Sequence, residues 1–157
     1  LGDVYKRQGK WMRGMSERIQ SWCHLNDDNV NLSKIETPMD PHLAEEIYLL
    51  DRCVECGCCV ASCGNFRMRA VAINKISRFR LDPRDHRNDA DYYEILGTES
   101  GVFGCMSLLA CHDFCPKDLP LKTQIAFMRR KMAEQGIMGK EEPSLKRVIP
   151  LRELKLD

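Results

Sequence analysis

The stretch CVECGCCVASC, residues 53–63, decides how this sequence of 157 residues is interpreted. Five of the nine cysteines in the chain fall within these eleven positions. Disulfides need a set separation and direction between two cysteines, and neighbours crowded in this way rarely meet that geometry. The odd total also leaves at least one cysteine without a partner. The crowding therefore indicates metal binding in a reducing setting.

Within this stretch, Cys53, Cys56, Cys59 and Cys63 are separated by two, two and three residues. This spacing is the bacterial ferredoxin run, in which three thiolates hold one 4Fe–4S cluster and the fourth ligates another cluster. Gly57 permits a close backbone approach inside the loop. A zinc site is the alternative, but four cysteines at this spacing are much more specific for an iron–sulfur cubane.

A second run contains Cys105, Cys111 and Cys115, followed directly by Pro116. Laid over the first run, these cysteines take its first, third and fourth places, and Leu108 takes the second. A leucine side chain has no lone pair for iron, so this corner lacks a protein ligand. With cross-ligation, the two runs predict one four-ligand 4Fe–4S site and one three-ligand 3Fe–4S site. The predicted ligands are Cys53, Cys56, Cys59 and Cys115 for 4Fe–4S, and Cys63, Cys105 and Cys111 for 3Fe–4S.

Two cysteines remain outside this scheme. Cys58 adjoins Cys59, and because adjacent residues point in different directions, both can hardly serve one corner of a cluster. We interpret Cys58 as a small buried hydrophobe beside the first cluster. Cys23 is distant in sequence, and we interpret it as a core cysteine.

The hydrophobic pattern predicts helices and no strand of convincing length. Trp11, Met15, Ile19 and Trp22 would form the core-facing side of the first helix. Asp40 followed by Pro41 marks the start of another helix, with a buried stripe at Leu43, Ile47 and Leu50. Three further helices are predicted over 70–79, 89–96 and 121–135, the last two closed by Gly97 and Gly136. Residues 105–111 are predicted as a helical turn, 26–37 as a polar connector, and the first helix as 10–23.

Composition narrows the classes of partner. The formal net charge of +1 creates no strong attraction to nucleic acid or anionic lipid. Charged residues make up 30% of the chain and aromatic residues 7%, as in an ordinary folded domain rather than a disordered segment. No apolar run approaches the roughly 20 residues that a membrane span needs.

The chain divides into three parts. It begins with Leu1 rather than Met, and residues 3–8 look like the translation of a common sequencing adapter. We interpret residues 1–8 as an adapter remnant, residues 9–136 as the helical cluster domain, and residues 137–157 as a polar C-terminal tail.

Four segments together resemble the iron–sulfur subunit of succinate dehydrogenase and quinol:fumarate reductase. They are LLDRCVECGCCVASCG (49–64), SRFRLDPRD (77–85), DYYEILG (91–97) and GVFGCMSLLACHDFCPKDLPLKTQIAFMRRKM (101–132). The resemblance covers about residues 10–132 and is nearest to the fumarate reductase type with a dihaem membrane anchor.

The resemblance implies an all-α fold, an α-helical ferredoxin domain with two cluster-binding loops. It also implies a preceding plant-type ferredoxin domain with a 2Fe–2S cluster, whose cysteine pattern this sequence lacks, so we expect a C-terminal part. Further implied are an FAD-containing flavoprotein subunit, a membrane-anchor subunit with haem b, and quinone. Such a subunit is peripheral on the cytoplasmic face of the bacterial inner membrane, where it relays single electrons and has no catalytic acid–base residues.

His112 and Lys117 flank the second run and are the candidates for the quinone side. The loop after Arg69 is shorter than in similar sequences, so quinone-site residues are not carried over to it. An alternative function is an iron–sulfur linker in a heterodisulfide-reductase-like or glycerol-3-phosphate-dehydrogenase-like complex. Those modules usually keep eight cluster cysteines, and Leu108 argues against them. A structural cluster in a nucleic-acid enzyme is disfavoured by the near-neutral charge.

Overall fold

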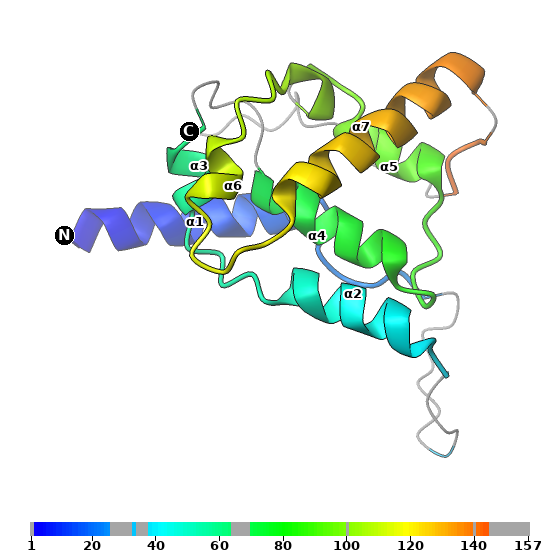
Figure 1. Cartoon of the computed structure of the whole chain (residues 1–157), viewed down its shortest axis with the longest axis horizontal. Helices are drawn as coiled ribbons and strands as arrows, with labels where there is room; N and C mark the ends of the chain where they lie inside the picture. The colour runs from blue at the N-terminus through cyan, green and yellow to red at the C-terminus, as the bar shows by residue number, and fades with distance from the viewer. Residues whose placement is uncertain are drawn as a thin grey trace.

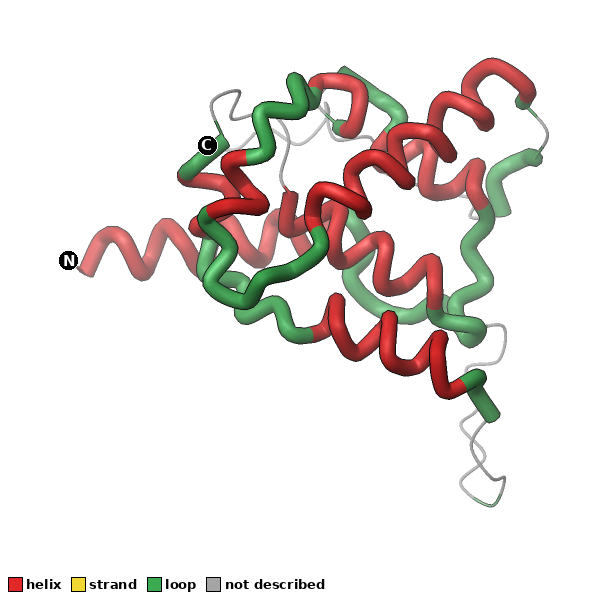
Figure 2. Tube along the Cα trace, in the orientation of Figure 1, coloured by secondary structure: helices red, strands yellow, loops and turns green. Residues whose placement is uncertain are grey.

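The computed structural model describes the backbone of residues 2–25, 33, 38–63, 70–99, 101–139 and 141–144, and the side chains from Gly9 onward. Within this part of the chain every regular element is a helix, which confirms the all-α prediction (Figure 2). The elements are α1 (Gly2–Arg18), α2 (Pro41–Asp51), α3 (Cys58–Ala61), α4 (Ala70–Leu81), α5 (Asp89–Leu96), a 3-10 turn η1 (Val102–Gly104), α6 (Ala110–Asp113) and α7 (Leu121–Met138). No helix in these ranges has the length and apolar character needed to cross a membrane.

Some predicted segments lie outside the described residues, and two predicted boundaries lie inside helices. Nearly all of the connector 26–37, and the tail beyond residue 144, lie outside the described residues. The boundary expected after residue 8 falls inside α1, and the boundary expected after Gly136 falls inside α7.

Helix α4 is the centre of the fold. Figure 1 shows it between α2 and α7, and both helices pack against it. Eight of its twelve residues are buried, so most of its circumference faces protein. The helix begins at the predicted Ala70 and ends at Leu81, directly before the sequence Asp82-Pro83.

Helix α2 begins as its sequence predicts. The Asp40 carboxylate accepts hydrogen bonds from the backbone N–H groups of His42 (2.9 Å) and Leu43 (3.2 Å), and Pro41 occupies the first turn. Ile47 and Leu50 are buried, whereas Leu43 is only partly buried. The helix ends at Asp51, two residues before the first cluster cysteine.

Helix α1 ends earlier than predicted. The backbone of Gln20 adopts a left-handed conformation (φ 48°), which breaks the helical path. Trp22 therefore leaves the core-facing side and is 51% exposed, so its predicted place in the core is wrong. The buried Arg87 guanidinium fixes this turn by donating hydrogen bonds to the backbone carbonyls of Ile19, Gln20 and Trp22, each at 3.2 Å.

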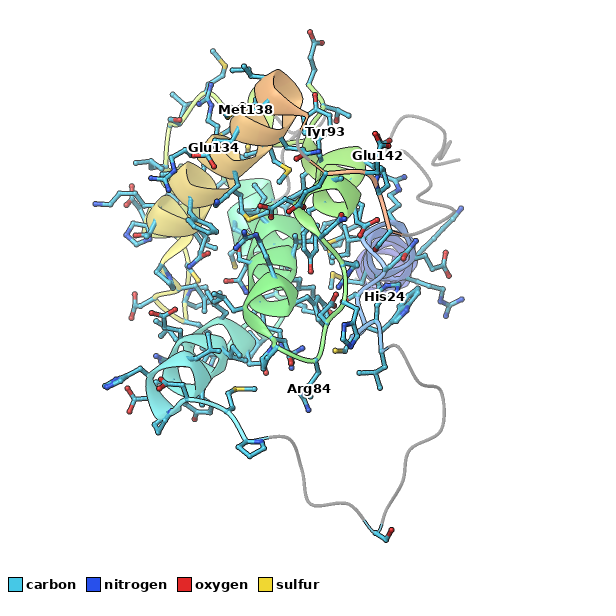
Figure 3. All side chains as sticks on the ribbon, turned by 90° about the vertical axis from the view of Figure 1, so that its right-hand side faces the viewer. His24, Arg84, Tyr93, Glu134, Met138 and Glu142 are labelled. Carbon is cyan, nitrogen blue, oxygen red and sulfur yellow. The ribbon has the colours of Figure 1, made fainter. Side chains whose placement is uncertain are left out.

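Helix α7 continues past Gly136, contrary to prediction, and ends where Gly139 turns left-handed (φ 52°). A Cβ at Gly136 would lie 2.9 Å from the Tyr93 hydroxyl oxygen, so this glycine allows α5 and α7 to pack closely. Figure 3 labels Tyr93 on α5 beside the end of α7. The α5 prediction is confirmed at both ends, with an Asn88–Asp91 capping box at its start.

Candidate metal centres

The first cysteine run forms a loop that leads from α2 into α3. Glu55 (φ 55°) and Gly57 (φ 79°) both turn left-handed, which curls the loop. The Gly57 carbonyl then accepts hydrogen bonds from the N–H groups of Val60 and Ala61, each at 3.0 Å, and starts α3. An ion pair between Lys75 of α4 and Glu55 ties the loop to the core.

A hollow of about 360 Å³ lies against this loop. Four cysteines drawn from both runs line it, namely Cys53, Cys56, Cys59 and Cys115. The rest of the lining is mainly apolar, with Val71, Leu119 and Leu121 as the largest buried contributors. The structure thus brings together the four cysteines that the sequence assigns to one 4Fe–4S site.

The second run is a loop rather than the predicted helical turn. Ser107 (φ 56°) and Leu109 (φ 59°) are both left-handed, and α6 begins only at Ala110. The loop is held from outside by Arg129 of α7, whose Nη1 donates to the Cys105 carbonyl at 3.3 Å and to Ser107 Oγ at 3.4 Å. The Ser107 N–H also donates to Cys105 Sγ at 3.3 Å.

A second hollow, of about 400 Å³, lies against this second loop. Its cysteines are Cys63, Cys105 and Cys111, and Leu108 also lines it. Leu108 is 66% exposed, so its side chain is not part of the hydrophobic core. The three cysteines are those that the sequence assigns to the 3Fe–4S site.

The two short helices connect the hollows. Helices α3 and α6 pack against each other (Figure 1). Along α3 and its end, Cys59 lines the first hollow and Cys63 the second. Along α6 and its end the order is reversed, because Cys111 lines the second hollow and Cys115 the first. Each run therefore contributes to both sites.

Burial has a clear effect on the thiols. Burial, together with neighbouring Cys53 and Cys111, raises the pKa of Cys59 to about 12. Burial also raises the pKa of Cys53 and, together with nearby Cys105 and Cys63, the pKa of Cys111. These thiols are protonated near neutral pH without metal, so binding of iron must displace their protons.

The donor set and the space fit iron–sulfur clusters. Every cysteine lining the hollows offers sulfur, and the hollows measure about 360 and 400 Å³ with the open space at their mouths included. Among the described residues, no three His, Cys, Asp or Glu side chains converge on a single ion. Thiolates spread around such a space suit a cluster of several irons.

The two remaining cysteines differ from their interpretation. Cys58 is exposed and lines neither cluster hollow, so its prediction as a buried hydrophobe is wrong. It is the first residue of α3, and the next residue, Cys59, takes the inward position. Cys23 is only partly buried and lines a separate hollow rather than the core.

The two quinone-side candidates lie in different surroundings. His112 is half-buried on α6, and its Nδ1 is 3.1 Å from the Leu119 carbonyl oxygen. Lys117 is exposed and lines the first hollow rather than the second. Neither residue is among those lining the second hollow.

Sequence reasoning missed one residue of the first site. Asn74, fully buried on α4, lines the first hollow. Its position three residues after Val71 places it on the same side of the helix. A polar residue on this otherwise apolar face was the available signal.

Comparison with known proteins agrees with this geometry. Residues 49–119 match the family model described as a 4Fe-4S dicluster domain. The chain is 52% identical over 137 residues to the fumarate reductase iron–sulfur subunit of Wolinella succinogenes, covering 84% of this chain and 57% of that protein. It is 30% identical over 88 residues to the succinate dehydrogenase iron–sulfur subunit of Bacillus subtilis, covering 53% of this chain and 35% of that protein.

A third relative is a subunit of another enzyme complex. The chain is 28% identical over 96 residues to the H(2)/formate:CoB-CoM heterodisulfide,ferredoxin reductase subunit C2 of Methanococcus maripaludis, covering 61% of this chain and 47% of that protein. The chain spans less than two thirds of the length of each of these three relatives. The strongest of these similarities extends over most of the chain. Over 84% of its length this chain is therefore similar to a fumarate reductase iron–sulfur subunit, and its residues 49–119 match a 4Fe–4S dicluster domain.

Proposed function

We propose that this chain is the electron-transfer subunit of a succinate:quinone or quinol:fumarate oxidoreductase. The observation that carries the proposal is the sorting of seven cysteines into a group of four and a group of three around two adjoining hollows. The 52% identity to a fumarate reductase iron–sulfur subunit supports the same function.

In this proposal, each hollow holds one cluster through its own cysteines. When bound, the two clusters supply one-electron carriers of different type. The ligands are Cys53, Cys56, Cys59 and Cys115 for 4Fe–4S, and Cys63, Cys105 and Cys111 for 3Fe–4S. Buried Val71, Leu119 and Leu121 form an apolar part of the wall of the first site. Packed helices α3 and α6 keep the two sites next to each other.

The partners follow from the family. We propose an FAD-containing flavoprotein subunit on one side and a membrane-anchor subunit with haem b on the other, on the cytoplasmic face of a bacterial inner membrane. A plant-type ferredoxin domain with a 2Fe–2S cluster would precede this chain, and residues 1–8 would be an adapter remnant.

His112 is the better quinone-side candidate. Donation from its Nδ1–H to the Leu119 carbonyl would leave Nε2 as an acceptor. Lys117 lies at the wall of the first hollow, so its proposed role would require the quinone side to extend there.

Electron paramagnetic resonance of the anaerobically purified chain tests the proposal. The air-oxidised protein should show a three-iron signal and the dithionite-reduced protein a four-iron signal, with four plus three irons per chain. Without partner subunits it should not oxidise succinate or reduce fumarate, because the proposal places the flavin on a partner. Absence of both signals from fully iron-loaded protein, or turnover by the chain alone, would contradict the proposal.

A linker subunit of a heterodisulfide-reductase-like complex is the second candidate. The similarity to the Methanococcus maripaludis subunit favours it. The two functions differ at Leu108, since a second four-iron cluster would need a ligand there. Two four-iron signals and no three-iron signal in the unmodified protein would favour this second candidate.

A further inference from the structure

A third hollow lies next to the first. It measures about 730 Å³, open solvent at its mouth included, and lies between the segment that follows α1, the end of α2, and α4. Its lining includes the polar or charged side chains of Ser21, Asp51, Lys75 and Arg78. A space this polar and roomy suits water, which occupies roughly 30 Å³ per molecule in the liquid.

Among the described residues, two line both the first hollow and the third, and they are Cys53 and Asn74. Cys53 is a proposed ligand of the 4Fe–4S cluster. Asn74 is 0% exposed on the central helix α4. These two residues therefore belong to the wall between a proposed cluster site and a polar space.

Of the two polar atoms of the Asn74 carboxamide, one has a hydrogen-bond partner among the described residues. Its Nδ2 donates a hydrogen bond to the Leu50 backbone carbonyl at 2.8 Å, which fixes the last turn of α2 three residues before Cys53. Its Oδ1 is buried and has no hydrogen-bond partner in the described protein. Because a buried unpaired amide oxygen costs free energy, this position requires a donor, and the third hollow has room for water to supply one.

We propose that Asn74 is a positioning residue for Cys53 that brings water to the wall of the first site and so raises the reduction potential of the 4Fe–4S cluster. This inference rests on the proposed function. Reduction adds negative charge, and polar surroundings stabilise the more highly charged form. An apolar residue at this position removes both the bond to Leu50 and the acceptor that holds water.

The test is a redox titration of the cluster-loaded full chain, followed by the four-iron resonance. The Asn74→Leu variant should require a lower potential, with the ratio of reduced to oxidised cluster at a given potential falling at least tenfold. That change equals about 59 mV for a one-electron couple. The three-iron potential should change less, because Asn74 does not line the second hollow.

Ser77→Ala is the matched control. Ser77 also lies on α4 and is 1% exposed, and its hydroxyl oxygen has no hydrogen-bond partner in the part of the chain that the structure describes. It lines neither the first nor the third hollow. If buried polar groups on α4 had only a structural role, the two variants would change the four-iron potential in the same way. The inference requires that Ser77→Ala keep the wild-type four-iron potential.

A second variant decides the matter if Asn74→Leu does not assemble its cluster. Cys23→Phe places a larger side chain against the third hollow and displaces water without altering Asn74. It should also lower the four-iron potential. An unchanged or raised potential in whichever variant retains the cluster overturns the role of Asn74, while the wild-type signals still support the proposed function. Absence of a four-iron signal from the wild type would instead overturn the proposed function.

Discussion

Cys115 lines the same hollow as Cys53, although the two residues come from opposite ends of the cluster-binding region. Conversely, Cys63 belongs to the first cysteine run but lines the second hollow, together with Cys105 and Cys111 of the second run. In the proposed ligand assignment, neither cysteine run completes a cluster site by itself. Both sites depend on the packing of α3 against α6, which makes cluster binding a property of the folded domain.

Removal of the Cys115 thiol distinguishes ligation of each cluster by both runs from ligation of each cluster by a single run. The Cys115→Ala variant should lose the reduced four-iron signal and keep the oxidised three-iron signal, because Cys115 lines only the first hollow. Electron paramagnetic resonance and iron analysis measure both. The matched control is Cys58→Ala, which removes an exposed thiol outside both hollows and should keep both signals. Loss of the three-iron signal alone in Cys115→Ala would refute cross-ligation.

Gly104 should be sensitive to a single added methyl group. A Cβ at this position would lie 1.8 Å from the Glu99 carbonyl oxygen, which is backbone and cannot move aside easily. Gly104→Ala should lower unfolding stability by about 1–3 kcal/mol and reduce occupancy of the three-iron site, since Cys105 follows directly. Thermal unfolding and iron content measure these effects. Gly9→Ala is the control, because nothing lies within 4 Å of its Cβ position in α1, and equal loss in both variants would contradict the steric argument.

His24 should make stability depend on pH. Burial lowers its pKa, as does the charge of Arg87, while Asp85 and Asp91 act in the opposite direction. Because the folded-state pKa lies below the unfolded value of about 6.5, stability is fully present above that pH and falls as the pH decreases through the window beneath it. Asp82 titrates lower, since Arg84 lowers its pKa from an already acidic value.

Thermal unfolding at about pH 7.5 and about pH 5.5 brackets the ordinary histidine value. The wild type should lose more stability between these conditions than His24→Phe, which keeps a ring against Trp22 but cannot be protonated. Parallel losses in the two proteins would show that His24 does not control the response.

Local sequence signals predicted most of the fold. The Asp40-Pro41 start of α2 and both ends of α5 depend on hydrogen bonds within a few residues, so local sequence suffices to find them. The grouping of the cysteines followed from spacing, because ferredoxin runs impose a known exchange of ligands.

The errors have a common physical origin in tertiary packing. Gln20, Ser107 and Leu109 adopt left-handed backbone conformations although none of them is glycine. Their residue types therefore did not predict these turns. Gly136 predicts a helix end from sequence, but in the structure this glycine allows close contact with Tyr93 on another helix. Asn74 lines both the first and the third hollow, and these hollows form only when the chain folds, so the sequence did not predict its place in the site.

Leu108 offers the most direct test of the three-iron assignment. It lines the second hollow together with Cys63, Cys105 and Cys111. In the overlay of the two cysteine runs it takes the place of a fourth ligand. Its 66% exposure means that substitution does not remove a core side chain. Left-handed Ser107 and Leu109 flank it, so the loop already curls around this position. The Leu108→Cys variant should supply a thiolate there and convert the three-iron cluster to 4Fe–4S.

The added thiolate carries negative charge, which stabilises the oxidised state and should lower the reduction potential of the converted cluster. The air-oxidised variant should lose the three-iron resonance, and the reduced variant should gain a second four-iron resonance. Leu108→Ser is the matched control, because a hydroxyl of similar size to a thiol is a poorer ligand for iron and should leave the three-iron signal largely in place. A persistent three-iron signal in fully loaded Leu108→Cys would place the open corner elsewhere in the hollow. If the unmodified protein already lacked that signal, a further ligand would be required, and exposed Cys58 would be the first cysteine to replace.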